Sequence, residues 1–352
     1  MAGGGGEIAG EEGSVADLGE WGVIAALKAR MPAGGLTSVG IGDDSAVVGA
    51  PSGSVVAAVD LLIEGRHFRR EWSSAYDVGV KAAARSLADI AAMGAVNTAL
   101  LVALATPGTL PARWATDLAS GLVAEATRAG AGIVGGDTAR ADYVTLSVTA
   151  LGDLEGRAPV LRSGARPGDV IAVAGRLGHS AAGLALLEAG AVQTAGEPGG
   201  ASIPAPLAEL VAAHLRPAPP YDAGPEAARL GATAMIDVSD GLLADLGHVA
   251  AASGVQVNVK TSSLAVGTAL HEAAARLSVP ESSSRTAAGF TPPSTALTWV
   301  LTGGEDHPLA AAFPPGTALP ARWRMIGEVR AGAGVTVDDE PHEGPAGWQH
   351  FR

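Results

Sequence analysis

The chain of 352 residues contains no cysteine. This absence excludes disulfide scaffolds, Cys-ligated zinc, iron–sulfur clusters and thiol nucleophiles together. Lysine is almost as scarce: the only three are Lys28, Lys81 and Lys260, and none stands in the G-x-x-x-x-G-K-[ST] context of a P-loop. The sequence also lacks the H-R-D and D-F-G segments of protein kinases, the G-x-S-x-G of α/β-hydrolases and the H-E-x-x-H of zinc proteases. The usual nucleotide-binding and hydrolytic classes are therefore excluded.

Basic charge is in deficit, with 23 Lys and Arg against 36 Asp and Glu, a net charge of −13 that gives no basic surface for nucleic acid. The longest apolar stretch, residues 88–105, is interrupted by one carboxylate and two polar side chains. It falls short of the roughly 20 apolar residues that a membrane span requires. The first residues carry acidic side chains and a glycine tract, the opposite of a secretory signal. We expect a cytoplasmic protein that binds neither nucleic acid nor membranes.

The length favours two domains, because a single domain usually spans about 100 to 200 residues. We expect a flexible tail at 1–17, an N-terminal domain at 18–152 and a C-terminal domain at 165–352, with a linker at 152–167 that ends in an Arg-Pro-Gly-Asp turn. Helices and strands alternate in both halves, so the expected fold is mixed α/β: a mixed sheet with helices, followed by an α/β domain.

Hydrophobic periodicity and turn residues set the expected elements. The predicted helices are 18–29, 75–93, 111–129, 180–188, 207–214, 242–252 and 265–277; the predicted strands are 54–62, 98–105, 132–134, 143–151, 170–174, 232–236, 255–259, 297–301 and 309–312; the predicted loops are 196–206 and 280–293.

Acidic residues gather beside glycines at four places. The clusters are Gly40-Ile41-Gly42-Asp43-Asp44, Gly135-Gly136-Asp137-Thr138, Asp237-Val238-Ser239-Asp240-Gly241 and Gly303-Gly304-Glu305-Asp306, with Asp60 and Asp89 as isolated carboxylates. Two unit charges 4 Å apart repel by about 4 kcal/mol at an intermediate dielectric. Gathered carboxylates without Lys or Arg therefore need a cation. Oxygen ligands alone favour Mg²⁺ or Mn²⁺ bound with phosphates, which suggests nucleotide chemistry.

Any one of these clusters also fits an ordinary surface turn, because Asp and Gly are common turn residues. Two of them follow apolar segments that we predict as buried strands: Asp237 comes directly after Ile236, and Asp137 comes shortly after Val134. Open α/β sheets bind their ligands beyond such strand ends. Taken together, the clusters favour a binding site over turns.

Eight segments in order resemble the thiamine-monophosphate kinase family, from about residue 18 to the end. They are GIGDDSA (40–46), VDLLIEGRHF (59–68), LADIAAMGA (87–95), GGDT (135–138), RSGARPGD (162–169), DVSDGL (237–242), GGED (303–306) and GWQHF (347–351). The family belongs to the superfamily of aminoimidazole ribonucleotide synthetase, whose members bind ATP through carboxylate-held Mg²⁺. The resemblance implies the two-domain fold of that superfamily.

The resemblance further implies that ATP phosphorylates thiamine monophosphate to thiamine diphosphate by direct in-line transfer, with no phospho-enzyme. It implies several Mg²⁺ ions, a homodimer that pairs the sheets of the N-terminal domains, and no covalent catalytic residue. By motif, the metal ligands would be Asp44, Asp60, Asp89, Asp137, Asp237 and Asp240, with Asp43 adjacent; the ATP contacts would be Gly136, Asp137, Arg162 and Ser239; the substrate contacts would be His67, Glu305 and Trp348.

The chain departs from the family pattern at several positions. His307 and Pro308 stand where the family usually has Tyr-Glu; Ala58 and Val59 stand where hydroxyl residues are common; Ser86 and Ala88 replace Asn and Ser. These departures leave the number of metal ions open.

Other interpretations remain. Aminoimidazole ribonucleotide synthetase is the nearest enzymatic alternative, a metal- and nucleotide-binding regulator without turnover is another, and an acidic structural protein is the weakest. The absence of cysteine argues against the selenophosphate synthetase and hydrogenase-maturation members of the superfamily.

Overall fold

The computed structural model describes residues 13–31, 34–41, 45–192, 204–278 and 295–348. The chain forms two compact units. Unit 1 contains Met1–Pro51, Ala57–Ser86 and Asn97–Leu151, and unit 2 contains Ser52–Val56, Leu87–Val96 and Gly152–Arg352. Most of the predicted tail at 1–17, and of the predicted loops at 196–206 and 280–293, lies outside the described residues.

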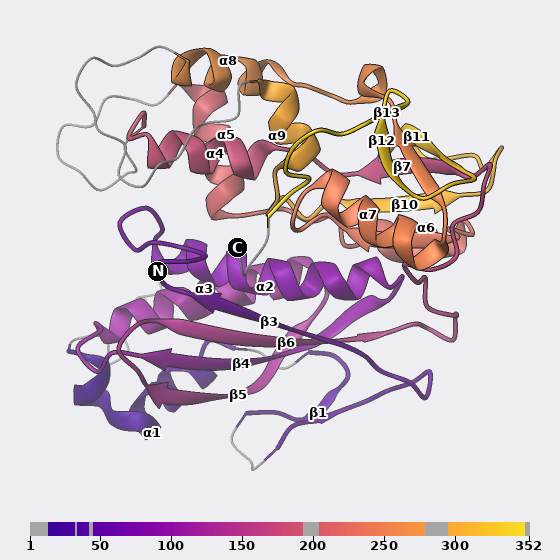
Figure 1. Cartoon of the computed structure of the whole chain (residues 1–352). Coiled ribbons are helices and arrows are strands. Elements are labelled where there is room, and N and C mark those ends of the chain that lie inside the picture. The colour runs from indigo at the N-terminus through magenta and orange to yellow at the C-terminus, as the bar shows by residue number, and fades with distance from the viewer. Residues whose placement is uncertain (1–12, 32–33, 42–44, 193–203, 279–294, 349–352) are drawn as a thin grey trace, which may run out of the picture. The chain divides into compact units, whose positions relative to one another are not determined.

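Unit 1 is built on a four-stranded sheet. Its strand order is β3 (Val56–Ile63), β6 (Thr145–Asp153), β4 (Val96–Thr106) and β5 (Gly132–Arg140), with β4 and β5 parallel. Helices α2 (Ala75–Ala92) and α3 (Ala112–Arg128) lie over one face of this sheet (Figure 1). The helix predicted at 75–93 is almost wholly buried, as its Ala-rich sequence favours. A small two-stranded sheet pairs β1 (Thr37–Val39) with β2 (Val47–Val48).

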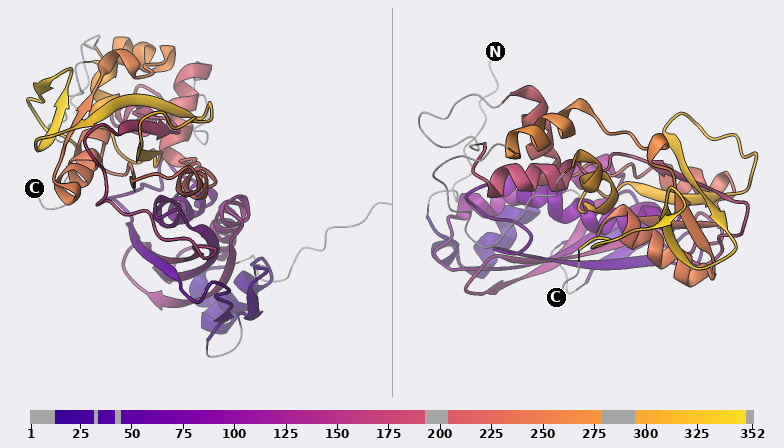
Figure 2. Two further views of the ribbon diagram at one scale, coloured as in Figure 1. Left: turned by 90° about the vertical axis from the view of Figure 1, so that its right-hand side faces the viewer. Right: turned by 45° about the horizontal axis from the view of Figure 1, so that its top comes forward.

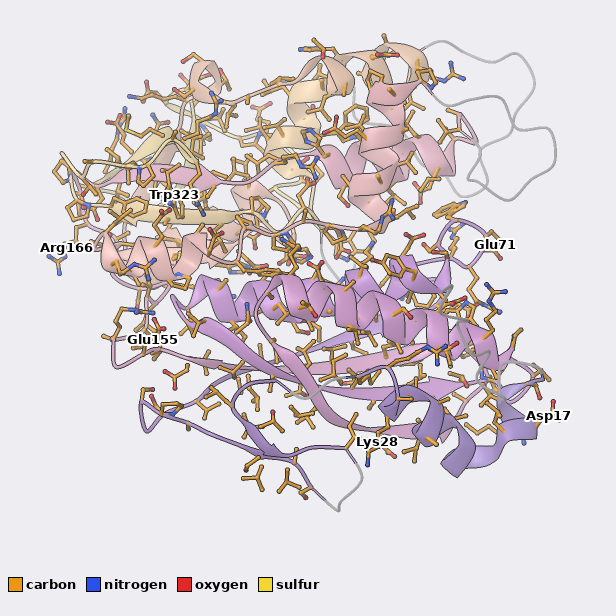
Figure 3. All side chains as sticks on the ribbon, turned by 180° about the vertical axis from the view of Figure 1, so that it is seen from behind. Asp17, Lys28, Glu71, Glu155, Arg166 and Trp323 are labelled. Carbon is orange, nitrogen blue, oxygen red and sulfur yellow. The ribbon has the colours of Figure 1, made fainter. Side chains whose placement is uncertain are left out.

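Helix α1 (Val15–Lys28) begins three residues before the predicted start at 18, because Ser14 and Asp17 form a capping box. The Ser14 hydroxyl accepts the Asp17 N–H at 3.3 Å, and Asp17 Oδ2 accepts the Ser14 N–H at 2.8 Å. Figure 3 shows Asp17 and Lys28 at opposite ends of this helix, an arrangement that complements the helix dipole.

Unit 2 contains a seven-stranded sheet in which the neighbouring strands are antiparallel except for the parallel pair β12 and β9. In spatial order its strands are β13 (Glu340–Pro341), β12 (Gly334–Val337), β9 (Gln256–Val259), β11 (Trp323–Arg330), β7 (Val170–Ala174), β10 (Leu309–Phe313) and β8 (Ala234–Asp237). Trp323, labelled in Figure 3, is buried in this unit. Its ring packs edge-on against Phe313, with 5.1 Å between the ring centroids. Its indole N–H donates to Glu226.

Two groups of helices complete unit 2. The helices α6 (Ala223–Arg229) and α7 (Leu242–Ser253) lie along the sheet, and α4 (His179–Glu188), α5 (Ala205–Leu215), α8 (Thr268–Leu277) and α9 (Ala296–Thr302) pack on one another, as Figures 1 and 2 show. A short 3-10 helix, η1 (Thr261–Ser263), precedes α8. None of the described helices is long and apolar enough to cross a membrane.

One predicted strand is wrong: residues 297–301 lie in helix α9. A five-residue apolar run fits a buried strand and a buried helix equally well. Thr295 decides between them, because its hydroxyl accepts the Thr298 N–H at the helix N-terminus. The predicted strand at 132–134 is too short, since β5 continues to Arg140. Six further elements have no counterpart among those predicted from the sequence: α6, β1, β2, β11, β12 and β13.

Candidate functional site

Asp60 is held in place by α2. It lies within β3, and its Oδ2 accepts the Ser86 hydroxyl at 2.9 Å. The carbonyl oxygen of Val148 lies 3.0 Å from the same hydroxyl. An Arg85 nitrogen is 3.8 Å from the other oxygen of Asp60. Ser86, one of the departures from the family pattern, therefore orients this carboxylate.

The turn after β3 fixes the ring of His67. Its Nδ1 accepts the Ile63 N–H at 3.0 Å, so the neutral ring carries its proton on Nε2. The turn itself is held by Glu64, whose two carboxylate oxygens accept from Arg70 and from the Val144 N–H. The Ile63 N–H and the Glu64 contacts therefore fix the orientation of the His67 ring.

Gly136 and Asp137 lie within β5 rather than beyond its end, which corrects the predicted position. A Cβ on Gly136 would come 1.9 Å from the Val102 carbonyl of β4, so the close approach of the strands by itself requires glycine here. Asp137 is exposed, and its Oδ1 accepts the N–H of Thr138 at 2.8 Å.

The structure does not bring Asp60 and Asp137 together. Strands β3 and β5 are the opposite edges of the unit 1 sheet, with β6 and β4 between them. Three interstrand spacings correspond to about 14 Å. Asp43 and Asp44 lie outside the described residues, so their placement stays a prediction.

Unit 2 gathers three carboxylates at the end of β8. The sequence predicted Asp237 directly after a strand at 232–236; in the structure it is the last residue of β8, and it is buried. Asp245, which the sequence analysis missed, lies in the first turn of α7, where its Oδ2 accepts the N–H groups of Asp240 and Gly241 at 3.0 and 3.1 Å. Burial, and then the nearby charges of Asp237 and Asp240, raises the pKa of Asp245 to about 7. This crowding of negative charge is what a bound cation would relieve.

The segment that carries Glu305 is paired with the segment that carries Ser239. The Glu305 N–H donates to the Ser239 carbonyl at 2.8 Å, and a Cβ on Gly304 would come 2.2 Å from that same oxygen. Glu305 and His307 both adopt left-handed backbone conformations, with φ of 68° and 52°. Non-glycine residues there cost about 1–3 kcal/mol each and concentrate at functional sites. Predicted residues Asp237, Ser239, Asp240 and Glu305 are therefore brought together.

Trp348 joins the same group through its backbone. Its N–H donates to the Asp240 carbonyl at 2.9 Å, while the residue is 62% exposed. This bond places the backbone of Trp348 beside Asp240. Arg162 is also exposed, and its carbonyl oxygen accepts the hydroxyl of Ser253, the last residue of α7. Asp89 lies half-buried on the part of α2 that belongs to unit 2.

Asp306 links the segment that carries Glu305 to helix α4. The residue is 8% exposed, and its Oδ1 accepts the Ser180 N–H at 2.9 Å in the first turn of α4. Burial raises the pKa of Asp306 to about 7, against the weaker lowering by that hydrogen bond.

We predict a pH-dependent effect for Asp306→Asn. An acid whose pKa is raised on folding holds its proton more tightly in the native state, so between about pH 4 and 7 its ionisation lowers stability as pH rises. Asparagine keeps an oxygen for the Ser180 N–H and cannot ionise. The unfolding free energy of the variant, relative to the wild type, should rise between pH 4 and pH 7 in urea titrations; a constant difference would show that Asp306 does not titrate there.

The donor chemistry of this site suits a hard divalent cation, because the predicted ligands are carboxylates. Within the described residues, no three His, Asp or Glu side chains are placed to hold a metal ion by themselves. Mg²⁺ needs only one or two carboxylates, since it keeps waters and takes substrate phosphates as further ligands. The carboxylates of unit 2 therefore fit such an ion when phosphates complete its shell.

Comparisons with known proteins identify the chain. Residues 42–154 match the family model of the AIR synthase related protein N-terminal domain, and residues 166–339 match the model of its C-terminal domain. Thiamine-monophosphate kinase from Mycobacterium tuberculosis is 47% identical over 98% of this chain and 95% of the relative. The chain belongs to the thiamine-monophosphate kinase family. The family member from Corynebacterium glutamicum is 38% identical over 96% of this chain and 95% of its own length.

Solved structures of the thiamine-monophosphate kinase family confirm the predicted two-domain α/β fold. The enzyme from Stenotrophomonas maltophilia K279a superposes with a TM-score of 0.76 at 33% identity, covering 91% of this chain and 96% of that one. A complex of AaThiL with AMPPCP and TMP superposes with a TM-score of 0.73 at 30% identity, covering 95% of this chain and 98% of that one.

Proposed function

We propose that the chain transfers the γ-phosphoryl group of ATP to the phosphate of thiamine monophosphate, giving thiamine diphosphate and ADP. The observation that carries this proposal is its end-to-end relation to thiamine-monophosphate kinases, at 47% identity over 98% of the chain. The AMPPCP and TMP complex of a relative supports ATP as the phosphoryl donor. The family relation favours this reaction over that of aminoimidazole ribonucleotide synthetase.

Divalent ions, with Mg²⁺ proposed, would be held by Asp44, Asp60, Asp89, Asp137, Asp237 and Asp240. Bound there, such ions would neutralise the phosphates and the charge that develops during transfer. Two polyanions could not otherwise approach these carboxylates. EDTA should abolish product formation, and added Mg²⁺ should restore it; transfer that continues in EDTA would contradict the metal assignment.

The protein's own groups would bind and orient the two substrates. Gly136, Asp137, Arg162 and Ser239 are proposed for ATP, with the exposed Arg162 guanidinium suited to a phosphate. His67 would donate from Nε2, and Glu305 would contact the thiamine moiety from its fixed backbone. No side chain is proposed to carry the phosphoryl group, so transfer is direct and in line. A radiolabelled γ-phosphate found on the protein would contradict direct transfer.

Trp348 is proposed to contact the cationic thiazolium ring. A cation over an indole face contributes about 0.5–2 kcal/mol, which corresponds to a factor of about 2 to 30 in affinity. Trp348→Ala should therefore raise the KM for thiamine monophosphate by up to about 30-fold and leave the KM for ATP nearly unchanged. The comparison is made in steady-state kinetics with each substrate varied in turn. A larger effect on ATP would move Trp348 out of the thiamine site.

We also propose that the enzyme is a cytoplasmic homodimer. Val59 and Leu61 lie two residues apart on edge strand β3, so their side chains point to the same face of the sheet. They are 65% and 47% exposed. Apolar side chains on an exposed edge are typical of a surface that pairs with another chain. Light scattering should give twice the chain mass of 34.7 kDa, and Val59→Lys should shift the protein towards the monomer.

A further inference from the structure

A buried histidine contacts one of the proposed metal ligands. Nδ1 of His307 lies 3.1 Å from Oδ2 of Asp237, and the two side chains are only 3% and 6% exposed. A carboxylate accepts hydrogen bonds, so the ring donates from Nδ1. Oδ2 is therefore the oxygen of Asp237 that accepts the hydrogen bond from His307.

The backbone holds the ring in that place. The His307 N–H donates to the Val238 carbonyl at 3.2 Å, and the Val238 N–H donates to the Pro308 carbonyl at 2.8 Å. These two bonds join the backbone next to Asp237 to the backbone at His307 and Pro308. His307 also keeps a left-handed backbone, with φ of 52°, which a histidine adopts only when its surroundings impose it.

We propose that His307 is a positioning residue: its hydrogen bond to Oδ2 fixes the rotation of the Asp237 carboxylate and leaves Oδ1 for the divalent cation. This inference rests on the proposed function, because it takes Asp237 as a ligand. A buried carboxylate without such a partner would turn about its Cβ–Cγ bond and lose the geometry that a cation needs. Loss of partners of this kind typically weakens metal binding by about 10- to 100-fold.

Three substitutions separate the hydrogen bond from the backbone and from the packing. His307→Gly accepts the left-handed backbone but removes the donor. His307→Asn also tolerates that backbone, and its amide nitrogen takes the position of Nδ1, so the donor is kept. His214→Ala is the matched control, because His214 is another buried histidine of unit 2, and its Nδ1 lies 3.1 Å from the Ser180 hydroxyl.

The experiment measures binding of the Mn²⁺–AMPPCP complex to each full-length protein by electron paramagnetic resonance, together with Tm, because phosphates are needed to complete the metal shell. We expect His307→Gly to bind this complex about 10- to 100-fold more weakly than the wild type. His307→Asn and His214→Ala should keep affinities close to the wild type. In the kinase assay, His307→Gly should raise the Mg²⁺ concentration for half-maximal rate more than it raises the KM for thiamine monophosphate.

Wild-type affinity in a folded His307→Gly protein would overturn the inference and leave the proposed function intact. Equal losses in the Gly and Asn variants would also overturn it, because the donor would then not be what matters. A wild-type protein that neither binds the Mn²⁺–AMPPCP complex nor forms product would overturn both the inference and the proposed function.

Discussion

Asp240→Asn is expected to lower kcat by about three orders of magnitude, equivalent to about 4 kcal/mol of transition-state stabilisation. Asparagine has the size of aspartate but no charge, so it binds Mg²⁺ poorly. The Asp240 carbonyl still accepts the Trp348 N–H, because that bond belongs to the backbone. The Asp240 charge also contributes to the raised pKa of Asp245, so its removal relieves repulsion. The variant should therefore keep the wild-type Tm or exceed it.

The matched control for this variant is Asp117→Asn. Asp117 is an exposed acid of α3 that pairs only at the surface, 3.6 Å from Arg113. Surface pairs contribute about 0–1 kcal/mol, so this change should alter neither kcat nor Tm measurably. If Asp240→Asn retained full turnover, the claim that this carboxylate holds a catalytic cation would be refuted.

Gly304→Ala is expected to damage stability and function together. The added Cβ would come 2.2 Å from the Ser239 carbonyl oxygen. This oxygen belongs to the backbone, so it cannot move aside as the end of a flexible side chain could. The segments carrying Ser239 and Glu305 must then separate, which breaks the Glu305 N–H bond to Ser239. We expect a loss of about 2–4 kcal/mol in unfolding free energy. In the protein that remains folded, the KM for thiamine monophosphate should rise.

Gly247→Ala is a control that should act in the opposite direction. Gly247 lies within α7, and a Cβ there would meet no atom within 4 Å. Replacement by alanine in a helix interior should stabilise the protein by about 0.5–1 kcal/mol. Urea titration of both variants measures the contrast. Equal stability of Gly304→Ala and the wild type would mean that the two segments do not approach as closely as described.

The sequence predicted the elements whose signals are local and long. Helix 75–93 has a continuous Ala-rich pattern, and strand 170–174 follows a clear turn. Asp237 was correctly placed at a strand end, because the apolar residues before it end abruptly. The run at 297–301 failed because its helical identity depends on one threonine cap rather than on periodicity.

The parts of the site that escaped prediction depend on contacts distant in sequence. His307 and Asp237 are 70 positions apart, and no local pattern marks a histidine as the partner of a carboxylate. Ser86 and Asp60, which share a hydrogen bond, are 26 positions apart. From the sequence, Ser86 was noted only as a departure from the family pattern. Asp245 carried a usable signal, since an acid in the first turn of a helix commonly accepts free backbone N–H groups.

The most direct test of the proposed function compares phosphoryl acceptors. Purified protein with ATP and Mg²⁺ is given thiamine monophosphate, free thiamine or the substrate of aminoimidazole ribonucleotide synthetase in parallel, and the products are separated and quantified. We expect thiamine diphosphate and ADP in equal amounts from thiamine monophosphate, and no product from the other two. Product from the ribonucleotide substrate, or none from thiamine monophosphate while ATP is bound, would contradict the proposed function.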